Sequence, residues 1–139
     1  PANGISAVSK TLSFEQARAS HERNLALLML HNPASMDELA VHIHHENLRR
    51  GRLKSRKIVR DDTFEIALRQ TRCRLHGIWG EHDTTIHPNL DAIRSLFLEV
   101  DPDATFDTLP DAGHWAAYES PAEFNAVLAR RLAEPTATA

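Results

Sequence analysis

The chain has 139 residues, with 16 lysines and arginines against 19 aspartates and glutamates and a formal net charge of −3. That length fits a single domain, since domains commonly contain about 100–150 residues. Apolar residues make up 42% of the chain and charged residues 25%, which is typical of a globular protein and excludes a disordered tail. The slightly acidic balance argues against a nucleic-acid partner, because binding to phosphates needs a basic surface.

Three features of the sequence bear on where the protein works. Its longest apolar run, Leu25–Leu30, is far shorter than the roughly 20 residues that span a bilayer, so we expect no membrane partner. The first residues contain neither the basic stretch nor the apolar stretch of a secretory signal. Cys73 is the single cysteine, which excludes an internal disulfide and favours a cytoplasmic location.

Residues 1–60 predict helices and no strand. Ser13 followed by Gln16 is a capping box, the side-chain pattern that opens a helix. The predicted helix should end before Pro33, because the residue before a proline disfavours helical backbone. Apolar side chains and one histidine share a face of this helix: Phe14, Ala17, His21, Leu25 and Leu28.

The same capping pattern occurs twice more before the first predicted strand. Ser35 with Glu38 predicts a second helix that runs toward Gly51. Asp62 with Glu65 predicts a short third helix. Residues 1–60 are therefore expected to be a helical region with little of the hydrophobic alternation that marks a sheet.

The second half of the chain, residues 61–139, predicts the order β-α-β-α. Residues 73–80 and 104–109 are the predicted strands, and Pro88 suits the first turn of the helix between them. A further capping box at residues 120–123 predicts the start of the last helix. Two parallel strands joined by a crossover helix form a right-handed unit, but they are too few for a stable parallel sheet. We therefore expect the edge of a larger α/β sheet.

An acidic and a basic side chain follow the two predicted strands. Asp83 comes after the first strand, and His114 comes after the second. Functional groups gather at the carboxyl ends of strands in open α/β sheets, and a carboxylate there can orient an imidazole and stabilise its charged form. The alternative is that Asp83 is a turn residue and His114 an ordinary loop histidine. We favour the functional interpretation because both residues have this placement.

Two segments resemble the α/β-hydrolase superfamily. Residues 77–83, Gly-Ile-Trp-Gly-Glu-His-Asp, resemble its strand and acid motif, and residues 113–119, Gly-His-Trp-Ala-Ala-Tyr-Glu, resemble its catalytic-histidine segment. Together with residues 121–125 the pattern is most similar to the meta-cleavage-product hydrolases, which break carbon–carbon bonds in aromatic catabolism. The resemblance is strong over residues 73–132 and weaker over residues 12–60, which look like the lid of this superfamily.

The resemblance implies a fold, a site and a reaction. Residues 1–60 would be a helical lid, and residues 61–139 would be the last two strands and helices of the hydrolase core. Asp83 would be the acid of a Ser-Asp-His triad, His114 its general base, and Trp115 a wall of the substrate pocket. The substrate would be a small molecule, a 2-hydroxy-6-oxo-dienoate made by ring fission of a catechol, and no cofactor would be needed.

A basic run in the lid offers an anchor for the substrate's carboxylate or enol oxygens. The resemblance points to Arg52, with Arg49 and Arg56 as rivals. Arginine suits this role because its planar fork binds oxyanions through two hydrogen bonds. The competing interpretation is a solvated basic face, which is equally compatible with the run.

One departure from the family is large, because the chain contains no G-x-S-x-G nucleophile elbow. It also contains only five glycines, about half of the usual share of roughly 7%. We therefore expect a C-terminal fragment whose main partner is the missing N-terminal half of the same hydrolase. The chain alone is predicted to be inactive, and the assembled enzyme to be a homo-oligomer.

Two other function classes remain open. The same acid and base serve esterases, lactonases, epoxide hydrolases and haloalkane dehalogenases, and the last two use an aspartate nucleophile. The chain could instead be a non-catalytic binding module whose helical region docks a partner; such a module would fold alone.

Other chemistry-bearing residues receive structural interpretations. His42 and His45 share a helix face and could bind zinc, but a site needs further ligands, so we predict no metal. Cys73 is predicted to be a small buried residue rather than a nucleophile. Trp79 is predicted to lie in the sheet core.

Overall fold

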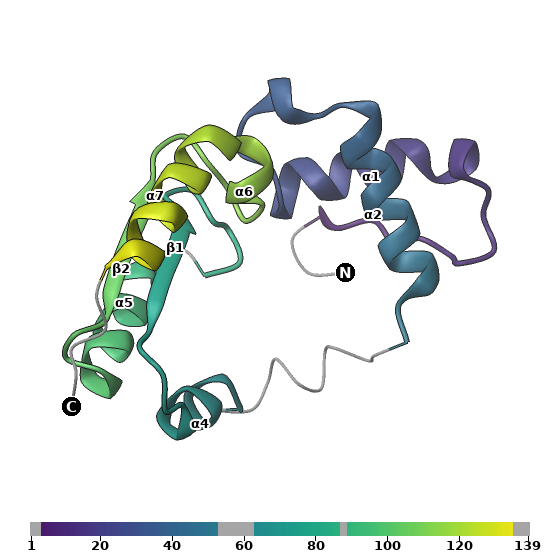
Figure 1. Cartoon of the computed structure of the whole chain (residues 1–139). Helices are drawn as coiled ribbons and strands as arrows, with labels where there is room; N and C mark the ends of the chain where they lie inside the picture. The colour runs from purple at the N-terminus through teal and green to yellow at the C-terminus, as the bar shows by residue number, and fades with distance from the viewer. Residues whose placement is uncertain (1–3, 53–62, 87–88, 135–139) are drawn as a thin grey trace.

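A parallel pair of strands and six α-helices make up the described part of the chain, in a computed structural model that describes residues 4–52, 63–86 and 89–134 (Figure 1). The protein is therefore of the mixed α/β class. The elements in chain order are α1 (Phe14–Leu28), the short 3-10 helix η2 (Pro33–Ser35), α2 (Glu38–Arg50), α4 (Thr63–Gln70), β1 (His76–Gly80), α5 (Leu90–Val100), β2 (Thr105–Leu109), α6 (Ala116–Glu119) and α7 (Pro121–Ala133).

The two strands form the predicted parallel pair, with Gly77 opposite Phe106 and Gly80 opposite Leu109. The first strand is shorter than predicted and begins at His76. Upstream, the backbone N–H of Leu75 donates 3.0 Å to the Asp101 carboxylate, so the chain is held by a side chain there. This late start overturns the prediction for Cys73, which lies outside the strand and is exposed.

The helix starts were predicted with mixed success. The capping box of Ser13 and Gln16 is present, as predicted. The start of α2 was predicted wrongly, because Ser35 lies in η2 and Asp37 caps the helix by accepting a 2.8 Å hydrogen bond from the N–H of Ala40. The capping box predicted at Ser120 is also absent, since this residue ends α6 and begins α7 without a side-chain cap. The predicted contributions of residues 62 and 88 lie outside the described residues.

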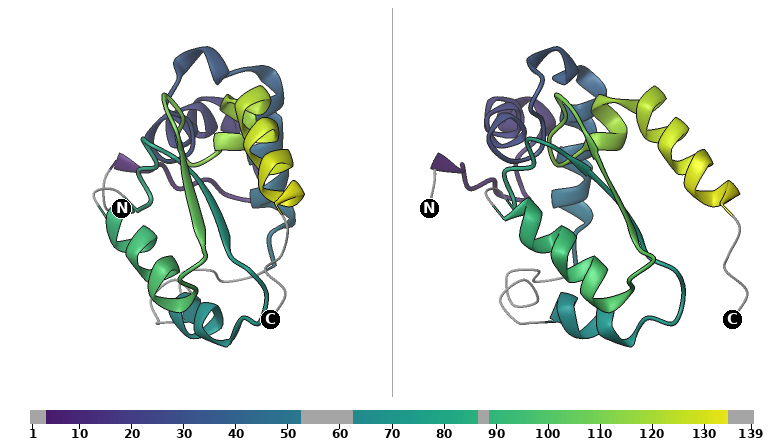
Figure 2. Two further views of the ribbon diagram at one scale, coloured as in Figure 1. Left: turned by 60° about the vertical axis from the view of Figure 1, so that its left-hand side comes forward. Right: turned by 90° about the vertical axis from the view of Figure 1, so that its left-hand side faces the viewer.

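Helices cover both faces of the two-stranded sheet (Figure 2). On one face, Phe97 of α5 packs against the aromatic side chains of Trp79 and Phe106, with Trp79 half-buried in this cluster. On the other face, Phe124 and Val127 of α7 pack around Leu109 and its neighbours. This alternation follows from the period of two in a strand.

A third core joins α1 to α2 through Leu25, Leu30, Ala40 and Val41. This helical part lies beyond the carboxyl ends of the strands, where α6 also lies (Figure 1). No helix among the described residues combines the length and the apolar character needed to cross a bilayer.

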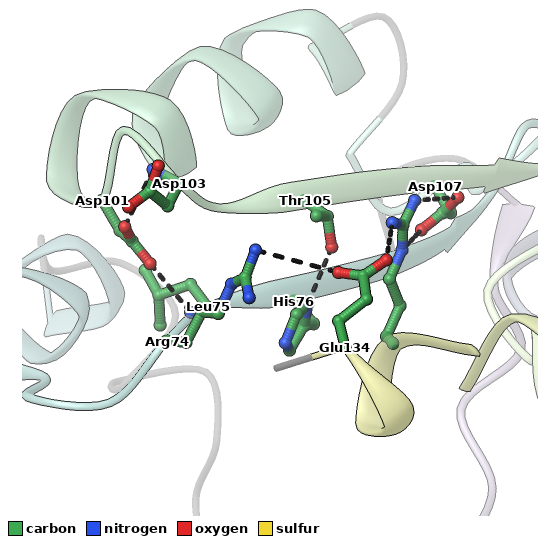
Figure 3. A network of polar contacts seen from close by, with 9 residues as sticks. Arg74, Leu75, His76, Asp101, Asp103, Thr105, Asp107 and Glu134 are labelled. Carbon is green, nitrogen blue, oxygen red and sulfur yellow. Dashed lines mark hydrogen bonds and ion pairs between the residues drawn. The ribbon is translucent and has the colours of Figure 1, made fainter. Parts of the chain in front are cut away.

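Polar contacts fasten α7 to β2 on its side of the sheet (Figure 3). Arg131 donates two hydrogen bonds to the carboxylate of Asp107, at 2.7 and 2.9 Å, and a further one to Glu134. Hydrogen bonding from Arg131 lowers the pKa of the Asp107 carboxyl and outweighs the opposing effect of burial. Next to it, the His76 ring and the Thr105 hydroxyl lie 2.7 Å apart across the strand pair.

Candidate active site

The structure brings Asp83 and His114 into contact where the two parallel strands end. Oδ2 of Asp83 and Nδ1 of His114 are 2.9 Å apart. The Asp83 side chain is 2% exposed, whereas that of His114 is 42% exposed. The pair therefore has a buried acid behind an imidazole that faces solvent, which is the order in which an acid orients a general base.

The close approach of the two loops depends on a glycine. A Cβ atom on Gly80 would lie 2.1 Å from the carbonyl oxygen of Gly113 and 2.4 Å from that of Ala112, so a side chain there is excluded. With this space free, the N–H of His82 donates to Ala112 at 2.9 Å. Backbone packing thus fixes the separation of the loops that carry the acid and the base.

Thr85 is a third member of this site that the sequence reasoning missed. Its hydroxyl lies 2.6 Å from Oδ1 of Asp83 and 3.2 Å from Nδ1 of His114, and its backbone N–H donates to the same Oδ1 at 2.9 Å. The signal was available, because an aspartate followed two residues later by a hydroxyl residue commonly forms a local turn of this kind.

The electrostatics favour an ionised Asp83. Burial alone would raise the pKa of the Asp83 carboxyl, but hydrogen bonds from Thr85 and His114 overcome it, and the pKa is lowered. An ionised Asp83 accepts the Nδ1 proton of His114, which leaves Nε2 as the lone-pair nitrogen. No described residue hydrogen bonds to Nε2, so this nitrogen is free to take a proton from a reactant.

Glu119 connects the helical part to the His114 loop, a role that its place in the family-like segment did not reveal. Its carboxylate accepts backbone hydrogen bonds from His31 at 2.8 Å, from Asn32 at 2.7 Å and from Gly113 at 2.6 Å. Beside it, the N–H of Trp115 donates to the carbonyl of Met29 at 2.9 Å. The segment after α1 is therefore attached directly to the loop that carries the base.

An open groove of about 420 Å³ reaches His114. Trp115 lies on its wall, and α2, β1, α6 and α7 supply mostly apolar lining. Such a lining beside one polar reactive group is typical of small-molecule sites. The other lining residues are Ile43, Asn47, Ile78, Ala116, Ala117, Tyr118 and Phe124.

The structure does not bring Arg52 to this groove. Arg52 is exposed just after α2, and it makes no hydrogen bond or ion pair with another described residue. Its rival Arg49 is engaged in two hydrogen bonds with Glu46, at 2.9 and 2.8 Å. The other rival, Arg56, lies outside the described residues.

His45, one of the two histidines considered and set aside as zinc ligands, belongs to a histidine network between α1 and α2. His21, from α1, is fully buried; its Nε2 lies 3.0 Å from Nδ1 of His45 and its Nδ1 lies 2.8 Å from Nδ1 of His44. Burial, followed by repulsion from its neighbours, lowers the pKa of His44 to about 4 and also lowers the pKa of His21. Ring-to-ring contacts among His21, His44 and His45 therefore hold α1 against α2, and His42 takes no part in them.

Comparison with known proteins adds no identity to this geometry. No protein-family model matches the chain, and no curated protein is significantly similar to it.

Proposed function

We propose that this chain supplies the acid and the base of an α/β-hydrolase that uses a Ser-Asp-His triad. The observation that carries the proposal is the 2.9 Å contact between buried Asp83 and exposed His114, on neighbouring loops at the carboxyl ends of two parallel strands. Two further contacts support the proposal. Asp83, held by the Thr85 hydroxyl, orients the imidazole, and Trp115 lines an apolar groove beside it.

The proposed reaction is hydrolysis of a carbon–carbon bond in a 2-hydroxy-6-oxo-dienoate. His114 Nε2 would take a proton from the serine or from water and return it to the carbon that leaves, while the hydroxyl ends on the carbonyl carbon as a carboxylic acid. Asp83 would hold the Nδ1 proton throughout and stabilise the imidazolium. Trp115 and the groove would take the apolar end of this small-molecule substrate. Because Arg52 does not line the groove, no described arginine is proposed to hold the anionic end.

The nucleophile in this proposal comes from outside the chain, on the N-terminal half of the same hydrolase. The described sheet has two strands, and β1 pairs only with β2 among the described residues. Large apolar side chains are also left half or more exposed, with Ile66 at 54%, Leu39 at 56% and Leu132 at 74%. Further strands and helices would cover such surfaces. Assembly into a homo-oligomer and action in the cytoplasm are proposed with it.

Two alternatives follow from the same residues. An aspartate in place of the serine would make the assembled protein an epoxide hydrolase or a haloalkane dehalogenase, and a serine with a different pocket would make it an esterase. A non-catalytic binding module is favoured instead if the α1 and α2 region docks a partner and His114 has no reactant.

The test is an assay of ring-fission dienoate turnover by the polypeptide that joins this chain to its nucleophile-bearing half. We expect turnover that disappears in His114→Ala, remains in the control His42→Ala, and is absent from the 139-residue chain alone. A serine-directed fluorophosphonate should label the other half, which separates serine from aspartate enzymes. Normal turnover in His114→Ala would overturn the catalytic assignment. Dienoate turnover by the 139-residue chain without the other half would contradict the fragment proposal.

A further inference from the structure

Three side chains converge beside the acid turn without contributing to the acid–base pair. His31 follows α1, His82 precedes Asp83, and Asp111 lies in the loop between β2 and His114. One nitrogen of each histidine and one carboxylate oxygen all lie within 4.8 Å of one another. Two imidazoles and one carboxylate are ligands that suit first-row transition metals such as zinc and not magnesium or calcium.

The ligand atoms of these side chains are uncommitted. No described residue hydrogen bonds to the side chains of His31, His82 or Asp111, and the rings of His31 and His82 are stacked with their centroids 3.7 Å apart. The histidine network of α1 and α2 is different, because the Nδ1 and Nε2 atoms of His21 are both committed to other rings. The side chains with uncommitted ligand atoms are therefore His31, His82 and Asp111, and not His21.

The backbone that presents these side chains is already held in place. The N–H of His31 donates to Glu119 at 2.8 Å, and the N–H of His82 donates to the carbonyl of Ala112 at 2.9 Å. The hydroxyl of Thr84 donates to the carbonyls of Leu27 and Leu28, which end α1, at 3.1 and 3.2 Å. Backbone contacts thus fix the segments that carry His31 and His82, while the two imidazole rings make no hydrogen bond to a described residue.

We propose that His31, His82 and Asp111 bind a divalent transition-metal ion of the zinc type, which cross-links the segment after α1 to the loops that carry Asp83 and His114. Ligands of one tetrahedral zinc ion lie about 3.4 Å apart, so ligand atoms that lie within 4.8 Å of one another need to approach by at most about 1.4 Å. Exposed His31 must also turn out of its stack with His82, since an ion binds in the plane of an imidazole. The fourth position is left for water.

This proposal is independent of the hydrolase chemistry and concerns the chain by itself. A cross-link at this point would restrict the motion of both loops of the acid–base pair. The expected role is stabilisation of the loop geometry, with no metal step in the reaction.

The test is a titration of the tag-free, full-length chain with zinc, followed by calorimetry, and with cobalt, followed by absorption. We expect one equivalent of zinc, cobalt bands of a four-coordinate site, and no competition from magnesium. Loss of a residue that only orients a metal ligand typically lowers metal affinity by roughly 10–100-fold. His31→Ala, His82→Ala and Asp111→Asn each remove a ligand and should lower zinc affinity by at least that much. Asp111→Asn keeps a residue that tolerates the left-handed backbone found there, at φ 54°.

Two control variants complete the experiment. His42→Ala removes an exposed histidine and should leave zinc affinity unchanged. His44→Ala should also leave it unchanged, because the network with His21 lies elsewhere. The thermal midpoint should rise with zinc in the wild type and not in His82→Ala. The proposal is overturned if no saturable binding occurs, if the three ligand variants bind as the wild type does, or if His44→Ala is the variant that loses the ion.

Discussion

The hydroxyl of Thr85 donates a 2.6 Å hydrogen bond to Oδ1 of Asp83, whereas His114 contacts the other carboxylate oxygen, Oδ2. Each oxygen of the buried acid therefore has a side-chain donor. Hydrogen bonds to a charged group contribute about 1.5–3 kcal/mol, which explains how a buried carboxylate stays ionised. The acid can then hold His114 in a single tautomer.

Replacing Thr85 by valine should disturb the acid without changing the size of the side chain. We expect the pKa of Asp83 to rise, because one of the three hydrogen bonds that oppose its burial is lost. Carbon-13 NMR titration of the Asp83 carboxyl in the chain alone measures this change. In the assembled hydrolase, turnover should fall about tenfold, which corresponds to roughly 1.4 kcal/mol. Thr85→Ser keeps the hydroxyl and should restore both values; equal pKa values in the two variants would refute the role.

Glu119→Gln should loosen the attachment of the helical part to the His114 loop. In the wild type the carboxylate accepts hydrogen bonds from three backbone N–H groups. The glutamine amide has only one acceptor oxygen, and its NH₂ group would face at least one of these backbone N–H donors. We expect the free energy of unfolding to fall by about 1–3 kcal/mol, measured by urea denaturation.

Glu123→Gln is the matched control for that variant, since Glu123 is exposed in the first turn of α7. Its stability should stay close to that of the wild type. Amide exchange at His31 and Gly113 should accelerate in Glu119→Gln alone. Unchanged exchange at both positions would show that the carboxylate does not hold these two segments together.

Asp107→Asn should remove the pH-dependent attachment of α7 to β2. The pKa of Asp107 is lowered in the folded protein, chiefly by Arg131, so its contribution is present above the unfolded pKa of about 3.9 and is lost as pH falls through the lower folded value. The wild type should therefore exceed the variant by about 1–3 kcal/mol at pH 7, and the difference should shrink at acid pH. Denaturation at a series of pH values checks this; a constant difference would contradict it.

Much of the site could be predicted because it follows from strand topology. Asp83 and His114 each follow a strand, and parallel strands end at one edge of the sheet. The start of α2 could not be predicted, because Ser35 and Asp37 both suit a cap and only the turn at Pro33 decides between them. The spacing of residues along one helix also cannot show which residues of another helix they will contact.

The histidines illustrate that limit. His21 was placed correctly on the inner face of α1 by its spacing, but the partners it meets come from another helix. A pattern within α2 suggested His42 with His45, because the two share a face. The rotation of α2 against α1 decides instead that His44 and His45 face His21, and this rotation depends on the packing of Leu25 and Val41.

The same network predicts how stability responds to acid. Burial lowers the pKa of His44 from its ordinary 6.5 to about 4 and lowers that of His21, so the unfolded chain binds more protons than the folded one in this interval. The histidine contribution is thus complete above about pH 6.5 and is lost as pH falls toward 4. For His44 the loss should reach up to about 3 kcal/mol.

His44→Gln, which cannot titrate, should flatten the decline in the free energy of unfolding between pH 6.5 and pH 4. The decline should not vanish, because His21 keeps its own lowered pKa. His42→Gln removes an exposed histidine outside the network and should reproduce the wild-type slope. Urea denaturation across this interval compares the three proteins. If His44→Gln declines as steeply as the wild type, the buried rings do not carry the acid sensitivity, and protonation elsewhere must weaken the contact between α1 and α2.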